Sequence, residues 1–272
     1  MVDTSQLNAT VTENRCLSPG LFLLRVLPDD PIPDFTPGQY VALGLPCIDI
    51  AARREAGTDE KNKQKEIEGN SRLTLVKRAY SIASSPSDKK GLEFYVARVN
   101  EGELSPNLTN LNIGDRLFVQ KKYVGTFTTC DVPDDKNLVF IATGTGIAPF
   151  ISMLRAPGLL RRFGRITILH GVRYVQDLAY RDEITELIES GVYDLGYYAT
   201  VSREEGSQEN VRKGYIQSLL EDQIVPIEHA VDHIFLCGNP GMIKAVVDLL
   251  SLQGFREHTR KSPGNLHLEN YW

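Results

Sequence analysis

The sequence predicts two domains, an antiparallel β-barrel followed by an α/β domain with a parallel sheet. Up to about residue 130, short apolar runs alternate with Gly- and Pro-rich turns, which is typical of a barrel. After Pro133, strand-like and helix-like patterns alternate, which is typical of a parallel sheet covered by helices. A chain of 272 residues can form two domains, and we place them at residues 1–132 and 133–272.

In the first domain, β-branched and apolar residues predict strands at 21–27, 39–45, 78–83, 92–99 and 115–119. A short helix is expected at 106–111, with Ser105 as its N-cap. Residues 48–72 are highly charged and interrupt the strands, so we expect an insertion. A solvated insertion is the main interpretation, and a contact for a partner protein is the alternative.

In the second domain, four strands are expected at 137–142, 165–170, 197–202 and 233–237. Helices are expected at 148–154, 178–190, 215–221 and 240–252. Strands and helices in this order predict a parallel sheet with helices on both faces.

Composition excludes several classes of protein. The net charge of −5 and the pI of about 5.6 disfavour nonspecific nucleic-acid binding. The sequence has no run of about 18 apolar residues, so we expect no membrane-spanning helix. Residues 1–10 carry neither a basic nor an apolar segment, so we expect no signal peptide. The four cysteines are widely separated, so we expect no metal site, no disulfide framework and a cytoplasmic location: Cys16, Cys47, Cys130 and Cys237.

The motif Arg78-Ala79-Tyr80-Ser81 lies on an expected strand. Alternation places Arg78 and Tyr80 on one face and Ser81 on the other. An arginine can bind a pyrophosphate with two hydrogen bonds, and a phenol ring can stack on a flat heterocycle. An ordinary surface arginine on a half-exposed strand would explain the tetrapeptide equally well.

Two glycine turns follow expected strands of the second domain. Gly144-Thr145-Gly146 opens a strand-to-helix unit, where glycines let the backbone approach a phosphate. Cys237-Gly238-Asn239 begins a second such turn at another strand end. Tight turns that bind nothing, and a cysteine that only packs, are the alternative interpretation.

Polar side chains gather near the end of the expected strand at 197–202. Ser202 and Arg203 are followed by Lys213 and Tyr215. A hydroxyl, two cations and a phenol suit a phosphate dianion beside a purine ring, as in the 2′-phosphate of NADP. A site selective for NAD would more often carry an acidic residue. Taken singly, each of these four side chains is more often a solvated surface residue than part of a binding site.

In this order and spacing, the motifs resemble the ferredoxin–NADP⁺ reductase family. The resemblance rests on R-A-Y-S, G-T-G-I-A-P-F, V-S-R-E, C-G-N-P and the final Tyr271-Trp272 pair, and it covers nearly the whole chain except 48–72. The ending resembles the bacterial flavodoxin/ferredoxin reductases, and K-G-Y-I-Q is more similar to the plastid branch. The resemblance implies an FAD-binding barrel and an NADP-binding α/β domain.

The resemblance also implies roles for individual residues. Ser81, Cys237 and Tyr271 are implied at the catalytic centre, where they shape a water-poor pocket and are not nucleophiles. The residues implied for FAD are Arg78, Ala79, Tyr80, Ser81, Tyr95, Val96, Ala97, Arg98, Glu103, Leu104, Ser105, Thr126, Thr145, Tyr271 and Trp272. Those implied for NADP are Gly144, Gly146, Val172, Arg173, Ser202, Arg203, Lys213, Tyr215, Cys237, Gly238, Asn239 and Met242.

The implied activity is FAD-dependent electron transfer between NADP(H) and ferredoxin or flavodoxin. A hydride passes to or from flavin N5, single electrons pass to or from the carrier, and the aromatic tail must shift if it covers the nicotinamide site. The carrier is acidic, so we expect a basic docking patch on a monomer, with candidates Lys121, Lys122, Arg161, Arg162 and Arg165.

Three other functions remain open at this point. The chain could be the reductase component of an oxygenase or hydrogenase, or a free-flavin reductase. It could instead be a non-catalytic regulator that binds flavin or nucleotide. A purely structural protein is the weakest alternative because it needs neither glycine turn.

Overall fold

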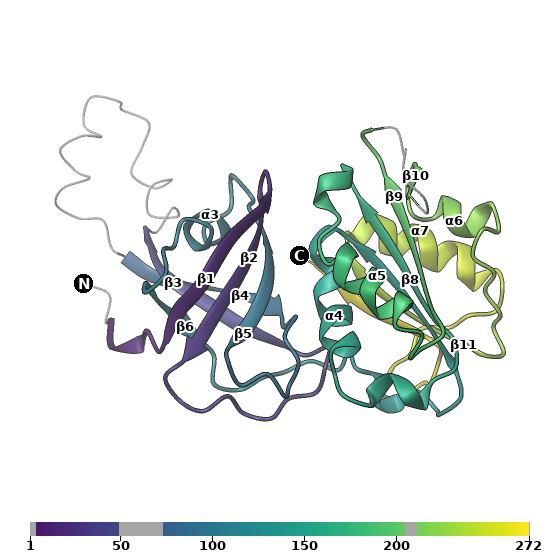
Figure 1. The fold of residues 1–272 in the computed structure, drawn as a ribbon, viewed down its shortest axis with the longest axis horizontal. Helices are drawn as coiled ribbons and strands as arrows, with labels where there is room; N and C mark the ends of the chain where they lie inside the picture. The colour runs from purple at the N-terminus through teal and green to yellow at the C-terminus, as the bar shows by residue number, and fades with distance from the viewer. Residues whose placement is uncertain (1–3, 49–72, 205–210, 272) are drawn as a thin grey trace.

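The computed structural model describes residues 4–48, 73–204 and 211–271. It has two lobes, an all-β lobe and an α/β lobe (Figure 1). Most of the expected insertion at 48–72 and the terminal Trp272 lie outside the described residues.

The first lobe is a six-stranded antiparallel sheet in the order β4-β3-β6-β1-β2-β5. The sheet curls so that the segment after β4 meets β5, where the Ala83 N–H donates to the Glu93 carbonyl at 2.8 Å. The expected antiparallel fold is therefore confirmed. The strands are β1 Ala9–Ser18, β2 Leu21–Pro28, β3 Tyr40–Ile48, β4 Leu73–Ser81, β5 Leu92–Ala97 and β6 Arg116–Val119.

Strand β1 is absent from the expected strands because its alternation is broken. Its register against β2 shifts between Val11 and Glu13 and again between Cys16 and Ser18. Such bulges interrupt the alternation of buried and exposed side chains along a strand, and this alternation is the pattern from which a strand is predicted.

The expected cap of the short helix is wrong in one respect. Helix α3 spans Ser105–Leu108, so Ser105 is its first residue and Leu104 takes the cap position. The Ser105 hydroxyl accepts a hydrogen bond from the Val99 N–H at 2.9 Å and does not cap the helix. Burial of the Leu104 side chain in the barrel core fixes this register.

The second lobe is a six-stranded sheet in the order β10-β9-β8-β7-β11-β12. Every neighbouring pair in it is parallel. The strands are β7 Asn137–Thr143, β8 Ile166–Val172, β9 Leu195–Val201, β10 Val211–Lys213, β11 Asp232–Gly238 and β12 Leu266–Asn270.

The expected helix at 148–154 is confirmed with the same bounds, whereas the other three helices are shorter than the sequence indicates. The expected helix at 215–221 is only Ser218–Glu221, because the chain leaves β10 through Gly214 with a φ of +130° and turns before the helix begins. Within the described residues, no helix is long and apolar enough to cross a membrane. The α-helices of this lobe are α4 Ala148–Leu154, α5 Arg181–Glu189, α6 Ser218–Glu221 and α7 Pro240–Ser251, and the 3₁₀ helices of the chain are η1 Thr4–Gln6, η2 Thr129–Asp131, η3 Gly144–Ile147, η4 Leu159–Arg162 and η5 Val175–Asp177.

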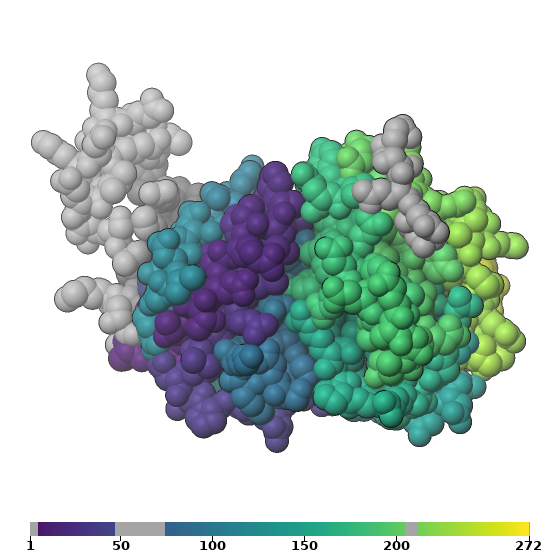
Figure 2. All heavy atoms as spheres, viewed as in Figure 1, coloured from purple at the N-terminus to yellow at the C-terminus, as the bar shows by residue number. Residues whose placement is uncertain are grey.

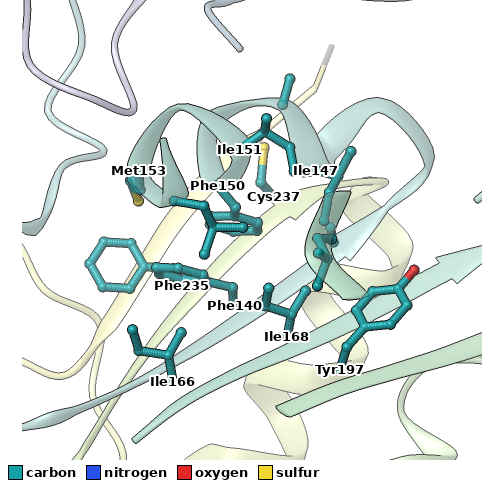
Figure 3. Packing of buried hydrophobic residues seen from close by; sticks show 14 of the residues in the cluster. Phe140, Ile147, Phe150, Ile151, Met153, Ile166, Ile168, Tyr197, Phe235 and Cys237 are labelled. Atoms are coloured by element: carbon teal, nitrogen blue, oxygen red, sulfur yellow. The ribbon is translucent and has the colours of Figure 1, made fainter. Parts of the chain in front are cut away.

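Helices cover both faces of the parallel sheet, as expected. Along β7, Phe140 faces the core beneath α4 and α5, whereas its neighbour Ile141 faces the core beneath α6 and α7. Figure 3 shows Phe140 and Phe235 of the sheet packed below Phe150 of α4. The rings of Phe140 and Phe150 stack with their centroids 4.6 Å apart. Burial on both faces explains why β7 is a continuous apolar run.

The two lobes are in direct contact (Figure 2). The contact centres on Glu93 of β5, whose side chain is only 4% exposed. Its carboxylate accepts hydrogen bonds from Arg25 of the same lobe at 2.7 Å and from Arg155 of the other lobe at 2.7 Å. The Tyr180 hydroxyl also donates to it at 3.0 Å. Burial by itself raises the pKa of Glu93, but the charges of Arg155 and Arg25 outweigh this effect and leave that pKa below its usual value.

We predict that Glu93→Gln lowers the free energy of unfolding by about 3 kcal/mol, because it leaves two arginines without their buried counter-charge. Urea unfolding at pH 7 measures the change. The matched control is Glu183→Gln, which removes the more exposed partner of Arg155 and should cost less than about 1 kcal/mol. Equal losses in the two variants would contradict a special role for Glu93.

Candidate functional site

The site lies where the chain leaves the carboxyl ends of β7 and β11. These strands are neighbours in the sheet although β8, β9 and β10 separate them in sequence. Such a point is where open α/β sheets bind ligands. The two glycine turns pack tightly against each other there, because a Cβ on Gly146 would lie 2.3 Å from the Cys237 carbonyl oxygen. A Cβ on Gly238 would lie 2.3 Å from the Thr143 hydroxyl oxygen, so both positions require glycine.

Gly144 opens the first turn with a φ of +53° and has free space where a Cβ would lie. Its carbonyl is fixed by the fully buried His170, whose Nε2 lies 3.2 Å from that oxygen. His170 Nδ1 lies 3.2 Å from the Tyr197 hydroxyl. Burial lowers the pKa of His170 to about 4, so the ring is neutral and holds the turn in place. Sequence reasoning missed His170 because nothing in its strand distinguishes it from a packed residue.

A cleft of about 650 Å³ runs between the lobes and along this end of the sheet. The barrel contributes Gly20 and Leu21 to its wall. Twelve residues implied by the sequence line it, so the structure brings much of the expected nucleotide site together: Ala97, Arg98, Gly144, Thr145, Val172, Arg173, Ser202, Tyr215, Gly238, Asn239, Met242 and Tyr271.

The three residues expected at the catalytic centre meet around one carboxylate that sequence reasoning did not assign. Ser81 at the end of β4 donates to Glu269 Oε2 at 3.1 Å and accepts from the Tyr271 hydroxyl at 3.1 Å. The Cys237 thiol donates to the same carboxylate oxygen at 3.7 Å. The Tyr271 hydroxyl also lies 3.4 Å from the Thr145 carbonyl. Residues of both lobes therefore build a single polar cluster.

Glu269 is the titratable group of this cluster. Burial raises its pKa to about 7, although the hydrogen bonds from Ser81 and Cys237 pull in the opposite direction. Burial also raises the pKa of the Cys237 thiol, and the nearby Glu269 raises it further. The thiol is therefore neutral and a poor nucleophile. The cluster can take up or release one proton near neutral pH through Glu269 and Ser81.

On the barrel, the residues implied for a flavin nucleotide have different surroundings. Arg78 and Ala79 are exposed, and Arg78 forms an ion pair with Glu103 in which Nη2 and Oε2 lie 2.6 Å apart. Tyr80 is partly buried, and burial raises its pKa to about 12. Thr126 is exposed on the loop after β6.

Four of the implied barrel residues point away from any exposed site. The Tyr95 hydroxyl donates to the Asp177 carbonyl across the lobe contact at 3.3 Å. Val96 and Leu104 are in the barrel core, and Ser105 is bonded to its own loop. In these four residues, only backbone atoms can contact a ligand unless the side chains move.

The residues expected around a 2′-phosphate come together at the ends of β9 and β10. These strands pair in parallel, with Lys213 opposite Val201. Arg203 follows β9 and is exposed, as are Lys213 and Tyr215. The Ser202 hydroxyl lies 3.4 Å from the Val172 carbonyl. Ser202 and Tyr215 line the cleft, and the two cations Arg203 and Lys213 are their neighbours in sequence at the ends of these strands.

The residues present fit a dinucleotide. The open Gly144 turn allows a phosphate to approach the backbone. Thr200, at the wall of the cleft, carries a buried hydroxyl that has no hydrogen-bond partner among the described residues. A buried polar atom without a partner is rare in native proteins, and a ligand would supply one.

Comparisons with known proteins agree with this arrangement. Residues 140–248 match the family model described as an oxidoreductase NAD-binding domain, and residues 66–127 match an oxidoreductase FAD-binding domain. The flavodoxin/ferredoxin–NADP reductase of Buchnera aphidicola subsp. Baizongia pistaciae is 34% identical over 259 residues, covering 92% of this chain and 93% of that protein. The protein of the same name from Shigella flexneri is 35% identical over 269 residues, covering 96% and 97%.

A solved structure shares the fold. The ferredoxin NADP⁺ reductase from Neisseria gonorrhoeae, with bound FAD and NADP, is similar with a TM-score of 0.79 at 22% identity. The similarity covers 97% of this chain and 98% of that one.

We predict that Glu269→Gln stabilises the protein at pH 8 by on the order of 2 kcal/mol but has little effect near pH 4.5. Between its usual pKa of 4.5 and the raised value of about 7, the folded protein binds more protons than the unfolded chain, so wild-type stability falls as the pH rises through this window. Urea unfolding at several pH values measures the difference. The exposed Glu221→Gln is the control, and a pH-independent effect of Glu269→Gln would contradict the assignment.

Proposed function

Because this chain belongs to the flavodoxin/ferredoxin–NADP reductase family, we propose that it transfers electrons between NADP(H) and ferredoxin or flavodoxin, with FAD as its cofactor. One observation carries the proposal. Ser81 of the barrel and Tyr271 of the α/β lobe are joined by a hydrogen bond beside the glycine turns. The end of the barrel's flavin motif therefore contacts the α/β lobe directly beside the nucleotide-binding turns.

At this contact between the lobes, FAD would supply a group that exchanges a hydride with NADP(H) and single electrons with the carrier. The protein's part is to bind, to orient and to manage protons. Arg78 and Tyr80 would hold the diphosphate and one face of the flavin. The neutral Cys237 and the Tyr271 ring would keep water out. Glu269 would hold a proton within reach of the Ser81 hydroxyl, which can pass it on.

On the nucleotide side, the rim of the cleft sets the preference for NADPH. Arg203 and Lys213 would bind the 2′-phosphate, and Ser202 and Tyr215 would contact the adenosine. The Gly144–Gly146 turn would accept the diphosphate. Because both cations are exposed, the preference depends on charge more than on shape.

We also propose that the protein acts as a monomer in the cytoplasm. Exposed free thiols at Cys16 and Cys130 support a reducing compartment. A sedimentation mass above the 30.4 kDa of one chain would contradict the monomer.

The decisive test is stopped-flow reduction of the FAD-loaded protein by NADPH and by NADH. We expect NADPH to bleach the flavin absorbance faster, and Arg203→Gln to weaken NADPH binding about 10-fold or more while leaving NADH unchanged. Arg212→Gln, an exposed cation on the neighbouring strand, is the control. A protein that binds nucleotide without bleaching would support the non-catalytic regulator.

We predict that ferredoxin or flavodoxin reduction slows by about 10-fold between 0.05 and 0.5 M salt, because an acidic carrier docks electrostatically. Several expected docking residues are already balanced by carboxylates, since Lys121 lies 2.7 Å from Asp30 and Arg162 lies 2.8 Å from Asp134. The exposed Lys122 is the better probe, and Lys122→Gln should slow the reaction at low salt only. Rates independent of salt would contradict docking by charge.

A further inference from the structure

The ion pair between Arg78 and Glu103 joins two segments that are 25 residues apart. Arg78 lies near the end of β4, and Glu103 lies in the loop between β5 and α3. Arg78 Nη2 donates to Glu103 Oε2 at 2.6 Å, and Nη1 donates to the Lys77 carbonyl at 2.9 Å. Each terminal nitrogen of the guanidinium therefore already makes one hydrogen bond within the protein.

This ion pair conflicts with the proposed use of the same arginine. If FAD binds as proposed, its diphosphate needs the Arg78 fork, which binds a phosphate best through two parallel hydrogen bonds. The Glu103 carboxylate holds that fork and carries the same sign of charge as the diphosphate. When Arg78 turns to the cofactor, the carboxylate loses its partner and stays beside a second anion.

No neighbouring cation of β4 takes over this task. The next one, Lys77, has its ammonium 3.9 Å from the centre of the Phe118 ring. Since side chains alternate along a strand, Lys77 points to the opposite face from Arg78. Arg98, in the loop after β5, lies 3.4 Å from the Asn110 side chain. Among the cations of β4, the diphosphate would therefore rely on the arginine that Glu103 already holds.

We propose that Glu103 limits the affinity of this protein for FAD by competing with the cofactor's diphosphate for Arg78. The inference rests on the proposed function, because it requires FAD to bind at Arg78. It identifies Glu103 as a determinant that weakens cofactor retention, in contrast to the binding role implied for it by resemblance. The protein then binds FAD more weakly, and releases it sooner, than its other residues would allow.

The test is Glu103→Gln, which keeps the size of the side chain and removes its charge. FAD is titrated into the flavin-free protein at low ionic strength, and quenching of flavin fluorescence gives the dissociation constant. We expect a 5- to 20-fold lower dissociation constant for FAD and a slower release. Riboflavin, which has no phosphate, should bind Glu103→Gln and wild type equally.

Glu101→Gln is the matched control, because Glu101 is an exposed residue of the same loop and its substitution changes the net charge by the same amount. It should change FAD affinity less than 2-fold. In an Arg78→Gln background, Glu103→Gln should no longer improve binding, since the two effects act through one contact.

The outcomes separate this inference from the proposed function. FAD binding that Glu103→Gln leaves unchanged or weakens overturns the inference alone. An equal gain from Glu101→Gln, or an equal gain for riboflavin, also overturns it, because either would show a general effect. If no variant binds FAD, the proposed function and the inference fail together.

Discussion

The geometry of the site depends on one buried carboxylate at the contact between the lobes. Glu93 belongs to the barrel, yet Arg155 just after α4 and Tyr180 just before α5 both bond to it. Arg155 also reaches the Ala83 carbonyl at 3.1 Å, just beyond the strand that carries Ser81. These polar contacts act together with apolar ones, since Phe127 of the barrel packs against Phe150 and Phe235 of the α/β lobe, and both kinds set the position of one lobe relative to the other.

A second group of contacts adjoins the first, since the ring of Tyr95 lies 5.7 Å from that of Tyr180. The Ser18 hydroxyl of β1 donates to the Asp177 carboxylate at 2.7 Å, and the Tyr95 hydroxyl donates to the Asp177 carbonyl. With the lobes fixed at both places, Ser81 and Glu269 meet at hydrogen-bond distance although they lie on different sheets. A displacement of about 1 Å would break such a bond, and preorganisation of this kind is what lets a site act without rearranging.

Much of the fold was predictable because it follows local patterns. The glycine turns after β7 and β11 stand where a buried apolar run gives way to a helix, and the structure places them there. Strand β12 has an alternating pattern, Leu266-His267-Leu268-Glu269, but the pattern is too short to predict a strand by itself. The broken register of β1 and the three-residue β10 leave too weak a pattern for periodicity to find.

The site was less predictable than the fold, because its chemistry comes from tertiary neighbours. Glu269 has an ordinary sequence context and becomes a group titrating near neutrality only when β12 lies beside β11 and Ser81. Likewise, nothing in the sequence near Glu103 indicates that it pairs with Arg78. The motifs predicted which residue types occur and at what spacing. Only the folded structure shows which of their side chains already form hydrogen bonds or ion pairs.

The hydrogen bond between Ser81 and Glu269 connects residues 188 positions apart. Closing such a long loop is entropically costly before each lobe has folded, and contacts of this separation form late. The flavin pocket should therefore be the last part of the molecule to assemble during folding. A chain with only one lobe folded would hold half of the cluster, so Ser81 and Glu269 become a bonded pair only once both lobes have docked.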